Sequence, residues 1–271
     1  MSFIQENKIE LNFSLKNEYK IIQISDVHAM TYSDFDSPSE INEAKKAEDL
    51  WYRQRTWFAG RANETYNDSH MIPSKECLSK LVDYINTQNP TAAVLSGDII
   101  DYYSKSNYEL LISECKRIKP PFVFSNGNHE IPASNYKEIT NSAIGFKVLN
   151  LGEFKIISLD NSTKSVSAET LDLVKNELED DIPVIIAMHI PISTIYNKKE
   201  MGKFDSYFII DENECDDTTK EFVNLLINNE NVKTILCGHT HGHSETYFAP
   251  NKPQICASSG LIGFVNNITI K

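Results

Sequence analysis

The sequence lacks any apolar run that approaches the roughly 20 residues that a membrane-spanning helix needs. Its first ten residues carry Glu6 and Glu10 where a signal peptide would have its apolar segment. Positive charge is also scarce, because 26 Lys and Arg residues face 38 Asp and Glu residues, which gives a net charge of -12 at pH 7. Basic side chains drive nonspecific binding to nucleic acids and to anionic lipids, so this balance argues against both. We therefore expect a soluble, cytoplasmic protein that does not contact membranes.

Cysteine is scarce and shows no pattern. There are five cysteines, an odd number, and no two of them have C-x-x-C spacing. A disulfide framework needs an even set and a thiolate zinc site needs closely spaced pairs, so neither is indicated. We expect all five to be reduced and structural: Cys77, Cys115, Cys215, Cys237 and Cys256.

The length of the chain sets the scale of the fold. A chain of 271 residues, 41% of them hydrophobic, can bury one large α/β core or two small ones. Strand-like and helix-like stretches alternate without internal repeats, which favours a single α/β domain over residues 1–271. A long stretch between the first strand and the next core helix predicts a helical insertion at residues 29–72.

The stretch from Ala93 to Asp101 combines a short apolar run with carboxylates. Residues 93–95 are typical of a buried parallel strand, and Gly97 allows the backbone to turn sharply and approach a ligand. Asp98 follows at the end of this strand, where α/β proteins place their ligands. Since a carboxylate has two oxygens, Asp98 can hold one cation on each and bridge two metals. Taken alone, a helix that begins at Ile99 and is capped by Asp98 would be the simpler interpretation.

Four further predicted strands end in polar side chains of the same kind. Alone, a D-x-H pair is usually a surface loop, and a histidine after a strand is usually a core residue. Residues i and i+2 of an extended segment point to the same side, so a D-x-H or H-x-H pair can hold one cation. The five strand ends contain five of the seven histidines, and a two-metal centre with nitrogen and oxygen ligands explains all of them. The side chains are Asp26 and His28, Asp98 and Asp101, Asn128 and His129, His189, and His239 and His241.

The predicted insertion contains a helix and most of the arginine in the chain. Ser37 and Glu40 have capping-box spacing, with proline at the first helical position and apolar residues following at helical spacing. One interpretation is an amphipathic helix with a solvated face. The other is a cap that leans over the site and helps to hold substrate. Three of the four arginines lie here among aromatic residues: Arg53, Arg55 and Arg61, with Trp51, Tyr52, Trp57, Phe58 and Tyr66.

The rest of the chain predicts further helices and strands. The sequence indicates a helix around residues 78–85, helix starts at the capping boxes that begin at Ser106 and Thr218, a hairpin of residues 147–150 and 154–159, an irregular segment at 190–217, and a strand-like tail at 245–270.

In this order, the polar blocks resemble the calcineurin-like metallophosphoesterase family, whose pattern is D-x-H, G-D-x-x-D, G-N-H-[D/E], H and G-H-x-H. The resemblance runs from about Ile21 to His243, and every block is present. It implies an α/β fold in which two mixed β-sheets pack as a sandwich flanked by helices, with the site at the strand ends. It also implies a hydrolase with two metal ions, and Mn, Fe, Zn and Co all accept this ligand set.

The resemblance also assigns roles to individual residues. A hydroxide that bridges the two metals would attack a phosphate ester. His129 would stand beside the leaving group as a general acid, oriented by Asp101. The ligands would be Asp26, His28 and His241 for the first metal, Asn128, His189 and His239 for the second, and Asp98 as the bridge between them.

Departures from the family pattern narrow the choice of substrate. Serine/threonine protein phosphatases of the family have phosphate-gripping arginines where this chain has Tyr102 and Asn126. That argues against such a phosphatase. It leaves a phosphodiesterase for small or cyclic nucleotides, which we favour, or a phosphomonoesterase for a nucleotide or sugar phosphate. A binding or scaffold relative is a third class, but it would have lost ligands, and none is lost here. We expect one of Arg53, Arg55 and Arg61 to bind this small-molecule substrate instead.

Overall fold

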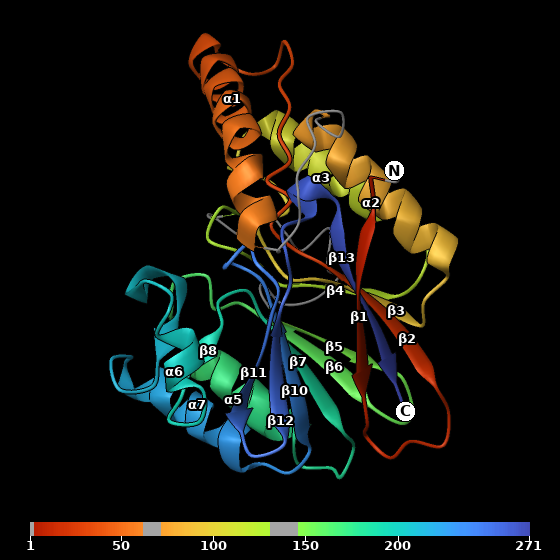
Figure 1. Cartoon of the computed structure of the whole chain (residues 1–271), viewed down its shortest axis with the longest axis vertical. Coiled ribbons are helices and arrows are strands. Elements are labelled where there is room, and N and C mark those ends of the chain that lie inside the picture. Colours follow the sequence, from red (N-terminus) through yellow and green to blue (C-terminus); the bar gives the residue numbers. More distant parts are fainter. Residues whose placement is uncertain (1–2, 62–71, 131–145) are drawn as a thin grey trace.

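Two β-sheets lie face to face in the computed structural model, which describes residues 3–61, 72–130 and 146–271 (Figure 1). The first consists of β1 (Gln5–Leu11), β2 (Tyr19–Ile24), β3 (Ala92–Leu95), β4 (Phe122–Phe124) and β13 (Phe264–Ile270), in the order β1-β13-β2-β3-β4. The second consists of β5 (Phe146–Asn150), β6 (Lys155–Leu159), β7 (Val184–Ala187), β10 (Val232–Cys237), β11 (Ser244–Ala249) and β12 (Lys252–Cys256), in the order β11-β12-β10-β7-β6-β5. Strands β2, β3 and β4 are parallel, as are β6, β7 and β10, so their carboxyl ends meet at one edge of each sheet.

Apolar side chains from both sheets form the core between them. Ile21 points into this core from the first sheet and Ile185 from the second, and both are fully buried. Phe154 lies in the same cluster, with its ring centroid 5.1 Å from that of Tyr19 and 6.3 Å from that of Phe13. The inner strands are buried on both faces, which explains why their sequences are apolar runs without alternation.

Helices cover the outer face of each sheet (Figure 1). The helices α2 (Ser74–Gln88) and α3 (Lys105–Arg117) pack on the first sheet, and α5 (Ala168–Glu177) and α7 (Asp217–Asn228) pack on the second. This order of helix, sheet, sheet and helix confirms the predicted sandwich. Within the described ranges, no helix is both long and apolar enough to cross a bilayer.

Short elements occupy the segment 190–217, which the sequence analysis treated as irregular. They are β8 (Ile192–Ser193), α6 (Lys198–Met201), the 3-10 turn η3 (Ser206–Phe208) and β9 (Ile210–Asp211), and β8 pairs with β9 in parallel. Elements of two to four residues are too short to leave a periodic pattern in a sequence. Another 3-10 turn, η4 (Gly260–Ile262), lies between the strands of the predicted strand-like tail.

The helix α1 (Pro38–Arg61) lies within the predicted insertion and projects from the sandwich (Figure 1). Its capping box forms as predicted, because the Ser37 amide donates to Glu40 Oε2 at 2.7 Å and the Glu40 amide donates to Ser37 Oγ at 3.3 Å. Trp51 is buried on one flank of the helix. The side chains of Phe58 and Arg61, and all of Tyr66, lie outside the described residues.

Two predicted helix starts are wrong by two residues. Ser104, not Ser106, caps α3 and accepts from the Asn107 amide at 3.1 Å, because the Ser106 hydroxyl bonds to that of Ser33. Asp216, not Thr218, caps α7 and accepts from the Thr219 amide. A carboxylate is a better cap than a threonine hydroxyl, so the earlier acid determines where the helix begins.

Replacing Phe154 by alanine should lower the free energy of unfolding by about 3–5 kcal/mol, since its fully buried ring fills space between the sheets. Urea unfolding, followed by circular dichroism, measures the change. Ile195→Ala, at a side chain 70% exposed, is the control and should change stability by less than about 0.5 kcal/mol. A similar small loss for both variants would mean that the ring does not fill the core as described.

Candidate metal centre

The polar residues that follow the inner strands come together where the two sheets meet. Residues after β2, β3 and β4 approach those after β7 and β10, although they are up to 213 positions apart in the sequence. Most of these side chains are buried, and Asn128 and His129 are partly exposed. The strand ends thus bring ionisable groups into a largely buried region, in which Asn128 and His129 are the more exposed of the described residues.

One cluster contains Asp26, His28, Asp98 and His241, whose possible ligand atoms lie within 4.8 Å of one another. His28 Nε2 is 3.1 Å from His241 Nε2, and His241 Nε2 is 3.2 Å from Asp26 Oδ1. The other ring nitrogen of His28, Nδ1, donates to Asp101 Oδ1 at 3.1 Å, which leaves the Nε2 lone pair facing the cluster. Burial lowers the pKa of His28, which favours the neutral ring that a metal needs.

A second cluster contains Asp98, His189 and His239, again within 4.8 Å of one another. His189 Nε2 lies 3.1 Å from His239 Nδ1 and 3.2 Å from Asn128 Oδ1. The His189 Nδ1 proton goes to the Ser96 carbonyl at 2.8 Å, and the Asn128 amide nitrogen donates to the Tyr207 hydroxyl at 3.2 Å. The remaining lone pairs of His189 and Asn128 therefore face inward.

Asp98 belongs to both clusters, as a bridging ligand would. Its Oδ2 atom lies 3.9 Å from His28 Nε2 and 3.1 Å from His189 Nε2. Its Oδ1 atom instead accepts a hydrogen bond from the His129 amide at 3.0 Å. We had expected each oxygen to face one cation, but here a single oxygen faces both clusters.

The donor set fits two metal ions. Carboxylate oxygens, an amide oxygen and histidine nitrogens converge with their lone pairs, and such an arrangement in a buried site is favourable when a cation lies between them. The negative charge of the carboxylates also favours positive charge on the neighbouring histidine His189. Burial alone would lower the pKa of His189, but Asp98 outweighs it and raises the pKa to about 9. A proton and a cation compete for that lone pair, so metal binding at this cluster releases a proton.

His129 and Asp101 form a third group beside the first cluster. His129 Nδ1 donates to the Asp101 carbonyl at 2.6 Å and lies 3.2 Å from Asp101 Oδ1. Burial would lower the pKa of His129, but Asp101 and Asp98 raise it to about 10, so the ring holds its proton at neutral pH. A cation beside Asp98 would offset part of this rise. The geometry leaves His129 able to donate a proton from Nε2.

Comparisons with known proteins show the family of the chain. The family model for calcineurin-like phosphoesterases matches residues 19–243. The chain belongs to this family. It is 25% identical over 165 residues to a probable cyclic nucleotide phosphodiesterase of Synechococcus sp., over 58% of this chain and 60% of that relative. The match thus spans less than two thirds of the relative.

One solved structure supports the fold. A dimetal phosphatase from Danio rerio aligns with a TM-score of 0.58 at 13% identity, over 90% of this chain and 88% of that one. A Thermus thermophilus structure aligns with a TM-score of 0.48 at 12% identity, over 90% and 91% of the two chains. The chain is therefore a metallophosphoesterase by family, with candidate histidine and aspartate ligands gathered at the strand ends.

Tyr102 and Asn126, which stand where protein phosphatases of the family have arginines, make contacts within the protein. The Tyr102 hydroxyl donates to the Glu40 carbonyl at 3.3 Å, and the Asn126 amide donates to Asp160 Oδ2 at 3.1 Å. Both side chains are neutral at these contacts. Neither position supplies a positive charge for phosphate.

Arg53 and Arg55 of α1 have partners as well. Arg53 is exposed and pairs with Asp49 one turn earlier, at 2.9 Å. Arg55 is buried, donates to the Ile72 carbonyl at 2.6 Å and lies 3.8 Å from Glu48 Oε1. These contacts hold Arg55 against the start of α2. That one arginine of this segment binds substrate stays a prediction.

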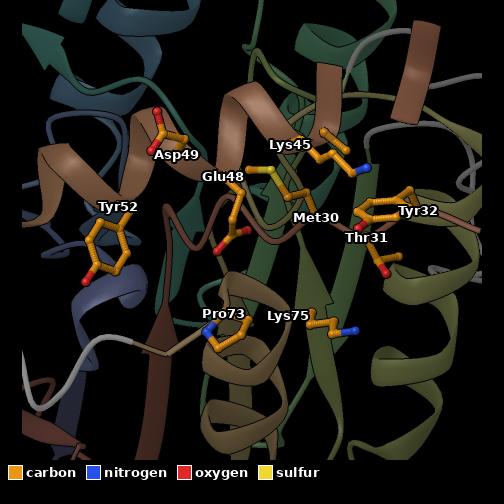
Figure 2. A pocket seen from close by; sticks show the side chains of 10 residues that line it. Met30, Thr31, Tyr32, Lys45, Glu48, Asp49, Tyr52, Pro73 and Lys75 are labelled. Carbon is orange, nitrogen blue, oxygen red and sulfur yellow. The ribbon is translucent and has the colours of Figure 1, made fainter. Parts of the chain in front are cut away.

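A groove of about 680 Å³ runs along another flank of α1 (Figure 2). Tyr52 and Lys45 of α1 and Lys75 of α2 border it, and Met30 lies at its back. Figure 2 shows the side chain of Glu48 between α1 and α2. The residues that line the groove include none of the predicted metal ligands.

The backbone of the motifs differs from the extended geometry that we expected. Asp26 and His28 have φ angles of 53° and 47°, and His239 and His241 have 66° and 55°. Asp98 has 51°. These left-handed conformations are uncommon for residues with a side chain and concentrate at functional sites. Each pair therefore reaches its cluster through tight turns, and the extended i and i+2 argument is wrong.

Glycines allow the motif loops to approach one another. Gly97 has φ of 90°, and a Cβ atom there would lie 2.4 Å from His189 Nδ1. A Cβ at Gly127 would lie 2.4 Å from the Asp98 backbone nitrogen. The predicted sharp turn at Gly97 is confirmed, its approach to a bound ligand stays a prediction, and the role of Gly127 was missed.

Glu130 is a further residue that sequence reasoning missed. Its fully buried carboxylate accepts hydrogen bonds from the backbone amides of Gly127, Asp98, Ile99 and Ile100. It thereby joins the loop after β4 to the loop that carries the shared aspartate. The only sequence signal was an acid directly after Asn128 and His129.

Replacing Glu130 by glutamine should lower the free energy of unfolding by roughly 2–6 kcal/mol, since one carboxylate oxygen becomes an amide that faces two buried N–H donors. Urea unfolding after chelation of metals measures this loss separately from metal affinity. The exposed Glu18→Gln is the matched control and should unfold like the parent. Equal midpoints for the two variants would contradict the role of Glu130.

Proposed function

We propose that the protein is a phosphodiesterase that hydrolyses a small, nucleotide-like phosphodiester at a binuclear metal centre. The observation that carries this proposal is the position of Asp98 between two clusters of buried ligands. Two bound cations would supply a hydroxide nucleophile near neutral pH and positive charge beside the phosphoryl oxygens. The proposed ligands are Asp26, His28 and His241 on one side, Asn128, His189 and His239 on the other, and Asp98 between them.

The lack of positive charge at two positions of the described site favours a phosphodiester substrate over a phosphomonoester. A phosphomonoester carries about -1.5 to -2 charges at pH 7, whereas a diester carries one. Tyr102 and Asn126 stand where protein phosphatases of the family have arginines, and both are occupied by neutral contacts. A substrate with less charge needs less cationic support. The probable cyclic nucleotide phosphodiesterase among the relatives fits the same substrate class.

His129 and Asp101 would handle the proton of the leaving group. His129 Nδ1 is held by the Asp101 carbonyl, which directs Nε2 away from that contact. We propose that His129 donates its Nε2 proton to the departing oxygen and that Asp101 orients the ring. This proton transfer matters most for leaving groups that are strong bases.

Asp98→Asn and His189→Ala should each lower the rate by more than about 100-fold, because each removes a ligand from a cluster. Protein reconstituted with manganese should contain two equivalents of metal by elemental analysis, and each variant should contain fewer. The exposed Asp181→Asn is the control. Rates on bis(p-nitrophenyl) phosphate and p-nitrophenyl phosphate distinguish a diesterase from a monoesterase. A folded protein that binds no metal even in excess manganese would rule out this function and leave a scaffold.

His129→Ala should keep its metals and lose about 100- to 10,000-fold in rate on a diester with an alkoxide leaving group. The loss should be much smaller for nitrophenolate, which departs without a proton. Comparing kcat for the two substrates gives the test. Equal losses on both would show that His129 does not act as the general acid.

A further inference from the structure

We infer that Trp51 is a positioning residue for the Asp101–His129 pair, through which helix α1 takes part in the reaction. The inference rests on the proposed role of His129 as general acid. Through Trp51, the helical insertion would influence proton transfer by His129. This role differs from the substrate binding that we predict for one of its arginines.

Three ring nitrogens converge on one oxygen of Asp101, two of them as hydrogen-bond donors. Trp51 Nε1 donates to Asp101 Oδ1 at 2.6 Å, His28 Nδ1 donates to the same oxygen at 3.1 Å, and His129 Nδ1 lies 3.2 Å from it. The indole N–H is only a donor and does not titrate, so its bond persists whatever the charge of the two histidines. Trp51 thus fixes the carboxylate that both rings share.

The indole ring also packs against the site. It stacks on the His28 ring, with centroids 4.0 Å apart and planes 24° apart. It meets the His129 and His241 rings edge-on, at 6.1 Å and 6.0 Å. These contacts leave the indole one orientation in which its N–H reaches Asp101.

Helix α1 is fixed to the sandwich close to Trp51. Glu48, one turn before it, accepts from the Ser74 amide at 2.9 Å and from the Ser74 hydroxyl at 2.6 Å. Ser74 Oγ in turn accepts from the Met30 amide at 3.1 Å, two residues after His28. Arg55, one turn after Trp51, donates to the Ile72 carbonyl. The indole is therefore held from the helix side as well as from the site.

The torsion that rotates a carboxylate is soft, so hydrogen bonds decide its orientation. Without the indole N–H, the contacts of the Asp101 carboxylate in the described part of the chain would be those with the two histidines, and the charge of His129 changes when it releases its Nε2 proton. A rotation of the carboxylate would remove its contact with His129 Nδ1, so the ring would lose one of the two Asp101 oxygens that orient it. The effect should therefore depend on the leaving group, as the effect of His129 itself does.

The first test is the variant Trp51→Phe, which keeps an aromatic ring for stacking but removes the donor. It should lose about 10- to 100-fold in kcat on the alkoxide diester and less than about threefold on the nitrophenyl diester, with unchanged metal content. Trp57→Phe, on an exposed side chain of the same helix, is the matched control and should lose nothing. In a His129→Ala background, Trp51→Phe should add no further loss.

Equal losses on both substrates, or a full additional loss in the His129→Ala background, would mean that Trp51 only supports the fold, and would overturn the inference. His129→Ala alone reports on the proposed general acid. If that variant shows no leaving-group dependence, the proposed acid fails first, and the role of Trp51 fails with it.

A second test needs no activity. The chain has two tryptophans, so two indole N–H signals are expected by nuclear magnetic resonance, and Trp57→Phe assigns them. The Trp51 proton should lie downfield and exchange slowly with solvent, and Asp101→Ala should move it upfield and speed its exchange. A Trp51 proton that exchanges as fast as that of Trp57, or that ignores Asp101→Ala, would overturn the inference.

Discussion

The buried charge of Asp98 constrains everything around it. A carboxylate removed from water is costly unless hydrogen bonds or cations compensate it. Histidines from both sheets face one of its oxygens, and a backbone amide satisfies the other. The Glu130 carboxylate holds the amides of the same turn, and glycine at position 97 leaves room for the His189 ring. Burial and the charge of Asp98 raise the pKa of Glu130 to about 7, so the two carboxyl groups of this turn depend on these amides and on positive charge close by.

The α/β class and the residues of the site could be predicted because each depends on a local pattern, whereas the sandwich of two sheets was predicted from the resemblance to the family. Buried parallel strands are apolar runs, and a polar residue directly after such a run lies at the edge of the sheet where others also end. That argument placed Asp26, His189 and His239 together from sequence alone. The order of the blocks then identified the family, which the match over residues 19–243 confirms.

What the sequence could not show are contacts between distant residues. Trp51 meets Asp101 across 50 positions, and its spacing on α1 indicated only a buried helical flank. Glu130 accepts hydrogen bonds from backbone amides 30 to 32 positions away. The left-handed turns at Asp26 and His28 were missed because residues with a side chain seldom adopt such a backbone, although aspartate and histidine do so more often than most. The extent of the insertion stays a prediction, since residues 62–71 lie outside the described part of the chain.

The candidate ligands are divided between the sheets. Asp26, Asp98 and Asn128 follow strands of the first sheet, whereas His189 and the pair after β10 follow strands of the second. Each cluster contains residues that follow strands of both sheets, so a bound ion would link the two sheets. A nascent chain that extends only to the loop after β4 has three oxygen donors and His28 but lacks the remaining nitrogens. Tight metal binding would thus require the later strands to have folded. The bound ion would then link the two sheets and slow their separation.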